Sequence, residues 1–213
     1  MIPLVKMCLS ATGDNVPEAG LIFYASFRDG IIAESGHELN ISDDGIGIVR
    51  AGDLGRNVLR INHDVLSFSQ DGLPVGDAPF TIALLANFQQ MDDNSMIFGW
   101  GSTPWGETVA AIRYVEGGVR LSAWGESNTG PEIDPDCGKW HHWCGVYDGL
   151  GNPQLYLDGE LVASGEFHFD VGNELAALGT FWACESVMLQ AANVRIYDRA
   201  LNSAEIKALA KER

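Results

Sequence analysis

The chain has 213 residues, 46% of them hydrophobic, and carries 13 basic against 29 acidic residues, for a formal net charge of −16. A surface this acidic repels the phosphates of nucleic acids and of anionic membranes, so we expect neither as a partner. No apolar run approaches the length of a membrane-spanning helix, and the opening residues MIPLVKMCLSATGDN lack a signal-peptide pattern. We expect no membrane insertion, while homo-oligomerisation stays open.

Residues 1–19 are expected to form an N-terminal arm and residues 20–213 a single domain, because no linker, repeat or low-complexity run divides the chain. Short apolar runs separated by Gly, Asp and Asn predict strands joined by turns. In chain order these strands are expected at 21–27, 47–51, 58–62, 66–69, 80–88, 95–101, 108–115 and 119–124. Three more are expected at 167–170, 177–182 and 187–197.

Residues 139–165, KWHHWCGVYDGLGNPQLYLDGELVASG, predict two hairpins in succession. Side chains of a strand alternate between its two faces. This alternation gives two sets: Trp140, His142, Cys144 and Val146 on one face, His141, Trp143 and Tyr147 on the other. Asp158-Gly159 between alternating runs predicts a type I′ turn, in which both central residues have positive φ. We therefore expect antiparallel sheet.

The C-terminal residues predict one helix. Asn202 can cap it, with Glu205 three residues later as the partner of a capping box. Ile206 and Leu209 then form an apolar stripe that can pack on a sheet.

Three of these segments carry a family resemblance. The run W-H-H-x-x-G-x-Y-D-G, the run L-Y-L-D-G-x-L-V-A-S-G and the late segment NVRIYDRAL resemble laminin G-like domains of the concanavalin A-like lectin and glucanase superfamily. The resemblance implies an all-β, concanavalin A-like jelly-roll sandwich of two antiparallel sheets with a short C-terminal helix. It also implies a lectin-like, non-catalytic recognition module that binds a glycan or a protein partner.

Aromatic residues near Gly-rich loops suggest where such a ligand binds. The candidate contacts are Trp100, Trp105, Trp124, Glu126 and Asn128, with Glu107 nearby. An indole face can stack on the C–H face of a sugar while polar side chains bind its hydroxyls. The alternative is that these tryptophans fill the core of the sandwich.

A glycoside hydrolase is a further alternative, because Glu132, Asp134 and Asp136 resemble the carboxylate motif of concanavalin A-like glucanases. Retaining hydrolysis needs two carboxyl groups about 5–5.5 Å apart, which neighbours on one strand can supply. Pro135 interrupts this run, and its Gly- and Pro-rich surroundings predict a loop. We therefore expect no enzymatic activity.

A structural calcium ion is a cofactor that the resemblance implies, held near the turn that enters the last strand. The residues there are Ala192-Asn193-Val194, so the first carboxylate of the family pattern is missing. Asn193 and Asp29 are the candidate ligands that remain. His141 and His142 point to opposite faces of their predicted strand and cannot share a metal.

Four cysteines, Cys8, Cys137, Cys144 and Cys184, form no CxxC pair. Cys144 is expected as a free thiol in the core, whereas a Cys137–Cys184 disulfide stays open.

The fold that the resemblance implies is typical of extracellular proteins, yet this sequence shows no export signal. This combination suggests a virion protein, such as a phage decoration or tail-associated component with other virion proteins as partners. We expect exposure at a virion or cell surface after assembly, and otherwise a cytoplasmic location.

Overall fold

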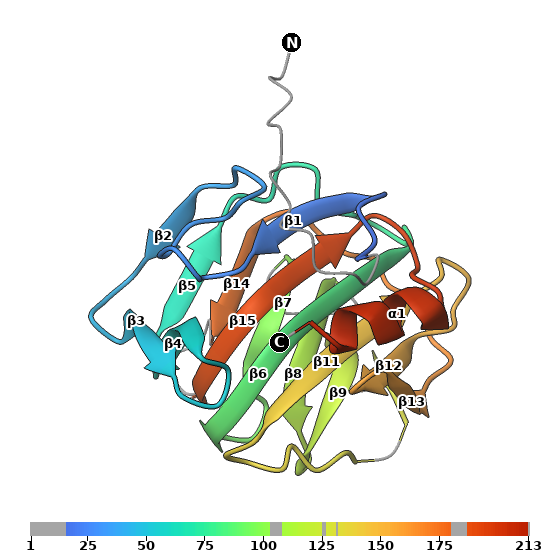
Figure 1. Cartoon of the computed structure of the whole chain (residues 1–213). Helices are drawn as coiled ribbons and strands as arrows, with labels where there is room; N and C mark the ends of the chain where they lie inside the picture. Colours follow the sequence, from blue (N-terminus) through green and yellow to red (C-terminus); the bar gives the residue numbers. More distant parts are fainter. Residues whose placement is uncertain (1–15, 103–107, 125–126, 131, 180–186, 213) are drawn as a thin grey trace.

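Two antiparallel sheets packed face to face make up the protein (Figure 1). The computed structural model describes residues 16–102, 108–124, 127–130, 132–179 and 187–212. Within these residues sheet A has the strand order β13-β12-β11-β6-β15-β4-β3, with β1 paired to β15, and sheet B has the order β10-β9-β8-β7-β14-β5-β2. Every pairing between these strands is antiparallel. The expected β-sandwich is confirmed.

The strands lie in the sheets in an order that differs from their order in the chain. Sheet A contains β1 (Leu21–Ala25), β3 (Ile46–Ala51), β4 (Arg56–Asn62), β6 (Phe80–Met91), β11 (Trp140–Tyr147), β12 (Gln154–Leu157), β13 (Glu160–Ser164) and β15 (Val187–Tyr197). Sheet B contains β2 (Leu39–Ile41), β5 (Val65–Phe68), β7 (Met96–Gly101), β8 (Val109–Val115), β9 (Gly118–Trp124), β10 (Ser127–Asn128) and β14 (Leu175–Gly179). The long strands β6 and β15 pair at the centre of sheet A, so distant parts of the chain meet there.

The main hydrophobic core lies between the two sheets. On β11, Trp143 and Tyr147 point into this core, whereas Cys144 and Val146 point to the outer side of sheet A. The alternation expected for this strand is therefore confirmed. Burying each large apolar side chain of the core stabilises the fold by about 1.5–3 kcal/mol.

Helix α1 (Ser203–Ala210) covers part of the outer side of sheet A (Figure 1). Its apolar residues Ile206 and Leu209 are buried against Cys144, Val146 and Tyr197 of the sheet. The predicted helix and its apolar stripe are confirmed. The outer side of sheet A is thus a second packing surface rather than an open face.

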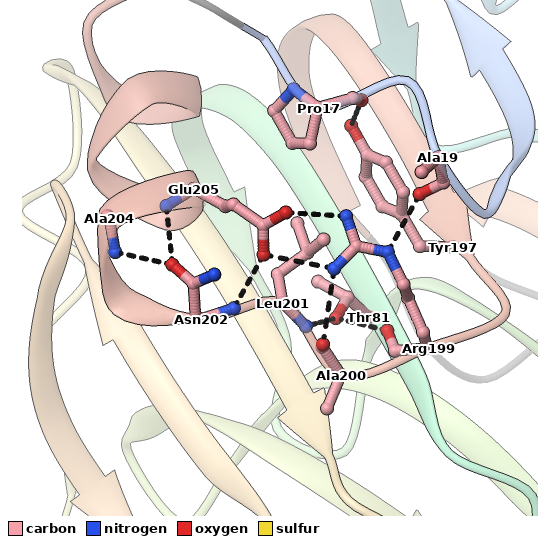
Figure 2. A network of polar contacts seen from close by, with 10 residues as sticks. All are labelled: Pro17, Ala19, Thr81, Tyr197, Arg199, Ala200, Leu201, Asn202, Ala204 and Glu205. Atoms are coloured by element: carbon pink, nitrogen blue, oxygen red, sulfur yellow. Dashed lines mark hydrogen bonds and ion pairs between the residues drawn. The ribbon is translucent and has the colours of Figure 1, made fainter.

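The predicted capping box fixes the start of α1 (Figure 2). The side-chain oxygen of Asn202 accepts hydrogen bonds from the backbone N–H groups of Ala204, at 3.0 Å, and Glu205, at 3.1 Å. In return the Glu205 carboxylate accepts one from the Asn202 N–H at 2.8 Å. These bonds satisfy N–H groups that have no partner within the helix.

Arg199 joins the start of α1 to the segment that precedes β1 (Figure 2). Its guanidinium donates to both carboxylate oxygens of Glu205, at 2.6 and 3.0 Å, and to the carbonyl oxygen of Ala19 at 2.8 Å. The Tyr197 hydroxyl donates to the carbonyl oxygen of Pro17 at 3.1 Å. The described end of the predicted N-terminal arm, residues 16–19, therefore lies against β15 and the helix.

Most predicted strands are confirmed, and the differences concern short segments. The strand predicted at 177–182 is observed as β14, Leu175–Gly179, and its last three positions, 180–182, lie outside the described residues. The prediction of a strand at 167–170 is wrong: the Phe167 N–H donates to the carbonyl oxygen of Gly151 and the Phe169 N–H to the Asp77 carboxylate, so this backbone joins loops. β2 and β10 lie in segments expected as loops, because two or three residues are too short to show a period. In the predicted turn Asp158 and Gly159 have φ of 50° and 86°, as a type I′ turn requires. No helix among the described residues is long and apolar enough to cross a membrane.

Candidate ligand-binding face

A small cluster of apolar side chains lies on the outer side of sheet B. Its fully buried members are Met96, Val109, Ala111 and Ala177. Trp124 packs against them and is itself half-buried. Because β8 and β9 are paired strands, Ser122 and Trp124 lie on the same outer side as Ala111 and Arg113. An aromatic ring, a hydroxyl and a guanidinium therefore meet at this end of the sheet.

Trp124 has an unusual backbone conformation. Its φ is +82°, a region that bulky side chains rarely adopt and that costs about 1–2 kcal/mol. The surroundings hold it there: its N–H donates to the Ser122 hydroxyl at 3.1 Å, and the next strand, β10, resumes pairing with Ser127 opposite Trp124. Strained backbone conformations of this kind are common at functional sites.

Arg113 supports the indole ring from one side. Its guanidinium carbon lies 3.9 Å from the centroid of the Trp124 ring, a cation–π contact of about 0.5–2 kcal/mol. The guanidinium is anchored in turn, donating to the Ser122 hydroxyl at 3.2 Å and to the Asn94 carbonyl oxygen at 3.3 Å. Arg113 is only 3% exposed, so it acts as a rigid base for the ring.

Asn128 lies beside this pair. It is half-buried on β10, opposite Ser122 of β9. The structure thus brings together Trp124 and Asn128, two of the predicted ligand contacts. Trp105, Glu107 and Glu126 lie outside the described residues. Arg113 and Ser122 were missed, although the alternation of the predicted 108–115 and 119–124 strands places both on the face of Trp124.

Trp100 has a different role from the one predicted. It is fully buried, its indole N–H donates to the Pro74 carbonyl oxygen at 2.7 Å, and its ring packs edge-on against Phe80 with 5.1 Å between centroids. It belongs to the core and offers no face to a ligand, which corrects its place among the predicted contacts. The sequence alone could not show that Trp100 is buried and Trp124 partly exposed, since both lie at or next to the end of a β-patterned run.

The carboxylates considered for hydrolysis lie in a loop, as predicted. The segment from Glu132 to Asp136 contains no strand, and the Asp134 side chain accepts a hydrogen bond from the Asp136 N–H at 2.8 Å. Asp136 in turn pairs with Lys139 at 2.8 Å and lies 3.7 Å from His141. The hydrogen bond from Lys139 is the main cause that lowers the pKa of Asp136, whereas a general acid needs a raised pKa.

The candidate calcium ligands occupy separate environments. Asp29 is exposed in the turn after β1. Asn193 is buried at a register shift of β15, where its side-chain oxygen accepts from Arg56 at 2.9 Å and its amide group donates to the Glu212 carbonyl oxygen at 3.1 Å. No group of three or more His, Cys, Asp or Glu residues in the described part of the chain is arranged to hold a metal ion. A structural calcium stays a prediction of the sequence.

A second polar group, missed in the sequence, joins two loops to the end of β11 at one rim of the sandwich. Asp77 accepts hydrogen bonds from the Tyr147 hydroxyl, from the Phe169 N–H at 3.2 Å and from the His168 ring at 2.8 Å. Burial favours a raised pKa for Asp77, but the hydrogen bonds from Tyr147 and His168 outweigh it and lower the pKa overall. Burial and Asp77 together raise the pKa of Tyr147 to about 12. Asp77 lies 70 to 92 positions from these partners in the chain, so no local motif could reveal the group.

The two described cysteines are both free thiols. Cys144 is buried under α1, as predicted, and burial raises the pKa of its thiol. Cys137 is exposed, while Cys8 and Cys184 lie outside the described residues.

Comparison with known proteins identifies the family but gives no close relative. A search of curated protein sequences found no significant match. Among solved structures, domain 4 of AbnA, an extracellular GH43 arabinanase from Geobacillus stearothermophilus, solved with arabinotriose, superposes with a TM-score of 0.73 at 19% identity and covers 92% of this chain and 100% of that chain. The binding domain of Paraclostridial Mosquitocidal Protein 1 gives 0.65 at 15% identity, covering 90% and 52%.

A Trypanosoma rangeli sialidase gives a TM-score of 0.63 at 19% identity, covering 92% of this chain and 33% of that chain. The chain therefore spans about half the length of the toxin binding domain and a third of the sialidase. Residues 62–207 match the profile of the concanavalin A-like lectin/glucanases superfamily. This match covers more than half of the chain and includes both hairpins and the last strand, so the protein belongs to the concanavalin A-like lectin/glucanases superfamily.

Proposed function

We propose that this protein is a non-catalytic recognition module that binds a glycan at the outer side of sheet B, with Trp124 as the principal contact. The observation that carries the proposal is the Trp124 ring itself. It is partly exposed, held at a φ of +82° and supported by Arg113 from one side. A rigid indole at a surface can stack on a sugar ring with little loss of side-chain entropy.

The neighbouring polar groups suit the same ligand. Asn128 places an amide beside the ring; its side-chain oxygen is buried, so the N–H donors of the amide are what it offers to sugar hydroxyls. The similar structures lend support at the level of class: one is an arabinanase domain solved with arabinotriose, and another is the receptor binding domain of botulinum neurotoxin D. A glycan is favoured over a protein partner because the assembled groups are one aromatic ring and an amide, rather than a broad apolar surface.

A glycan array followed by titration calorimetry tests this proposal, with arabinotriose included among the ligands. We expect saturable binding to at least one oligosaccharide, weakened about two- to twelvefold by Trp124→Ala, since an aromatic contact contributes about 0.5–1.5 kcal/mol beyond the area it buries. Arg113→Lys keeps the charge but removes the planar support of the ring, so it should also weaken binding.

Ile41→Ala is the control, because Ile41 is an exposed apolar residue on β2, at the other edge of sheet B from β9 and β10. It should leave binding unchanged. An array without any bound glycan, or equal affinity of the wild type and Trp124→Ala, would refute the proposal. The alternatives of a structural virion protein and of surface exposure after assembly stay predictions of the sequence.

A further inference from the structure

A buried cluster of charged residues lies on the outer side of sheet A, opposite the proposed glycan face. Arg56 begins β4, Asn193 and Arg195 belong to β15, and Glu212 follows helix α1. Arg56, Asn193 and Arg195 are only 6%, 1% and 3% exposed. The cluster lies between the apolar patch under α1 and a second apolar patch around Trp140.

The hydrogen bonds of this cluster leave several donors unsatisfied. Arg56 donates through Nη2 to the Asn193 side-chain oxygen at 2.9 Å. Arg195 forms an ion pair with Glu212 at 2.6 Å through Nη2, donates to the Asn193 carbonyl oxygen at 3.5 Å through Nη1, and lies over the Tyr24 ring at 4.3 Å. Nε and Nη1 of Arg56 and Nε of Arg195 are buried without an acceptor among the described residues.

The charges of the cluster do not balance. Arg56 has no carboxylate within 4 Å in the described part of the chain, and its one acceptor there is a neutral amide. Arg28 and Arg195 both lie near enough to disfavour its charge further, while Glu212 opposes them. Burial is the main cause that lowers the pKa of Arg56 to about 10, which still leaves it protonated at neutral pH. A buried, unpaired guanidinium is strongly unfavourable, so buried arginines normally have a counter-ion.

We propose that Arg56 and Arg195 form a binding site for a small oxyanion next to the C-terminal segment, where Glu212 pairs with Arg195. Both guanidinium groups contact Asn193, Arg56 through its side-chain oxygen and Arg195 through its backbone carbonyl, so the two cations lie close to one residue. Arginine N–H groups form strong, charge-assisted hydrogen bonds with phosphate, sulfate and carboxylate oxygens. An anion bound beside them would neutralise the excess positive charge and supply acceptors to buried N–H donors that lack one among the described residues.

Thermal unfolding of the full chain in inorganic phosphate, compared with chloride at equal ionic strength, tests the site. An anion that binds only the folded state raises the melting temperature in a saturable way. We expect a rise of several degrees in the wild type, absent in Arg56→Gln. Arg50→Gln is the matched control, since Arg50 is exposed on the neighbouring strand β3 and its loss should leave the rise intact. Acetate and sulfate arms distinguish a preference for carboxylates from one for tetrahedral anions.

A second measurement keeps the test independent of how well the variant folds. In the wild type, phosphate should shift the Nε–H NMR signals of Arg56 and Arg195 along a saturable curve, and Trp124→Ala should not alter that curve. Identical melting temperatures in phosphate, sulfate, acetate and chloride, or Nε–H signals that do not move, would overturn the proposal. An equal rise in Arg56→Gln and the wild type would overturn it as well.

Discussion

At the scale of single residues, His142 shows how a buried ring without partners makes stability depend on pH. It is 2% exposed on the outer side of β11, and neither ring nitrogen has a hydrogen-bond partner among the described residues. Burial is the main cause that lowers its pKa to about 3; the charge of Arg195 adds to the effect and Asp158 opposes it. The folded protein therefore keeps this imidazole neutral well below the pH at which a free histidine becomes charged.

We predict a loss of stability in mild acid that His142→Leu removes. The unfolded chain takes up the proton near pH 6.5 and the folded chain only near pH 3, so the contribution is fully present above 6.5 and is lost as pH falls towards 3. Between pH 7 and 5 the wild type should lose about 2 kcal/mol through this group. Urea unfolding at pH 7, 6 and 5 measures the difference in slope. Leucine breaks no hydrogen bond with a described residue, so little stability should be lost at pH 7.

Leu161→Ala is the control for this series, because it changes an exposed side chain without removing an ionisable group, so the acid slope should stay that of the wild type. Equal slopes in the wild type and His142→Leu would contradict the assignment of the effect to His142.

At the scale of elements, α1 depends on its cap and on the surface that it covers. Its eight residues are too few for a stable isolated helix, so its stability comes from the capping box and from packing on sheet A. We predict that Asn202→Ala destabilises the helix by about 1 kcal/mol, because the N–H groups of Ala204 and Glu205 lose their acceptor.

The thiol of Cys144 reports opening of the helix, since it is buried beneath Ile206 and Leu209. A change of about 1 kcal/mol corresponds to about fivefold faster labelling of this thiol by a thiol reagent. Peptide mass spectrometry separates Cys144 from exposed Cys137. Asn202→Asp keeps an acceptor at the cap and should label at close to the wild-type rate, whereas wild-type labelling in Asn202→Ala would show that the cap does not hold the helix.

At the scale of the whole molecule, the fold was predictable where its pattern was long and local. The alternation in β11, the Asp158-Gly159 turn and the capping box at Asn202 depend on residues close together in the sequence, and all three are confirmed. Residues 167–170 were wrongly predicted as a strand because Phe167 and Phe169 alternate in burial with their neighbours, as strand residues do. Their N–H groups, however, bond to other loops. Propensity cannot show where a backbone finds its distant partners.

The two candidate sites were predictable to different degrees. Trp124 and Asn128 were predicted as ligand contacts because aromatic and amide residues near turns suggest sugar binding; the structure shows that they are neighbours, and their role stays a prediction. The Arg56 cluster was not, because Arg56 and Asn193 lie 137 positions apart and meet only when β4 pairs with β15. A lone arginine in a β-patterned run gives no sign of whether it will be exposed or buried.

The pairing of distant segments also decides how the ends of the domain are held, and this leads to a prediction for Arg199. One guanidinium bonds both to Glu205 at the start of α1 and to Ala19 before β1 (Figure 2). Removing it with Arg199→Gln should loosen both segments together, because each loses a charge-assisted bond to the same group. Hydrogen exchange should therefore speed up several-fold in residues 16–25 and in α1, while β7 and β8 of sheet B exchange as in the wild type.

Lys207→Gln separates this link from a general effect of charge on the helix. Lys207 also lies on α1 and pairs with Glu160 at 2.9 Å, but both side chains are largely exposed and bond to none of residues 16–19, the described part of the N-terminal segment. It should leave exchange in residues 16–25 unchanged. If Arg199→Gln speeds exchange in α1 alone, the N-terminal segment is held by the Tyr197–Pro17 bond and by packing of Val16 instead. Faster exchange in both segments would show that a single side chain couples the first strand of the domain to its last helix.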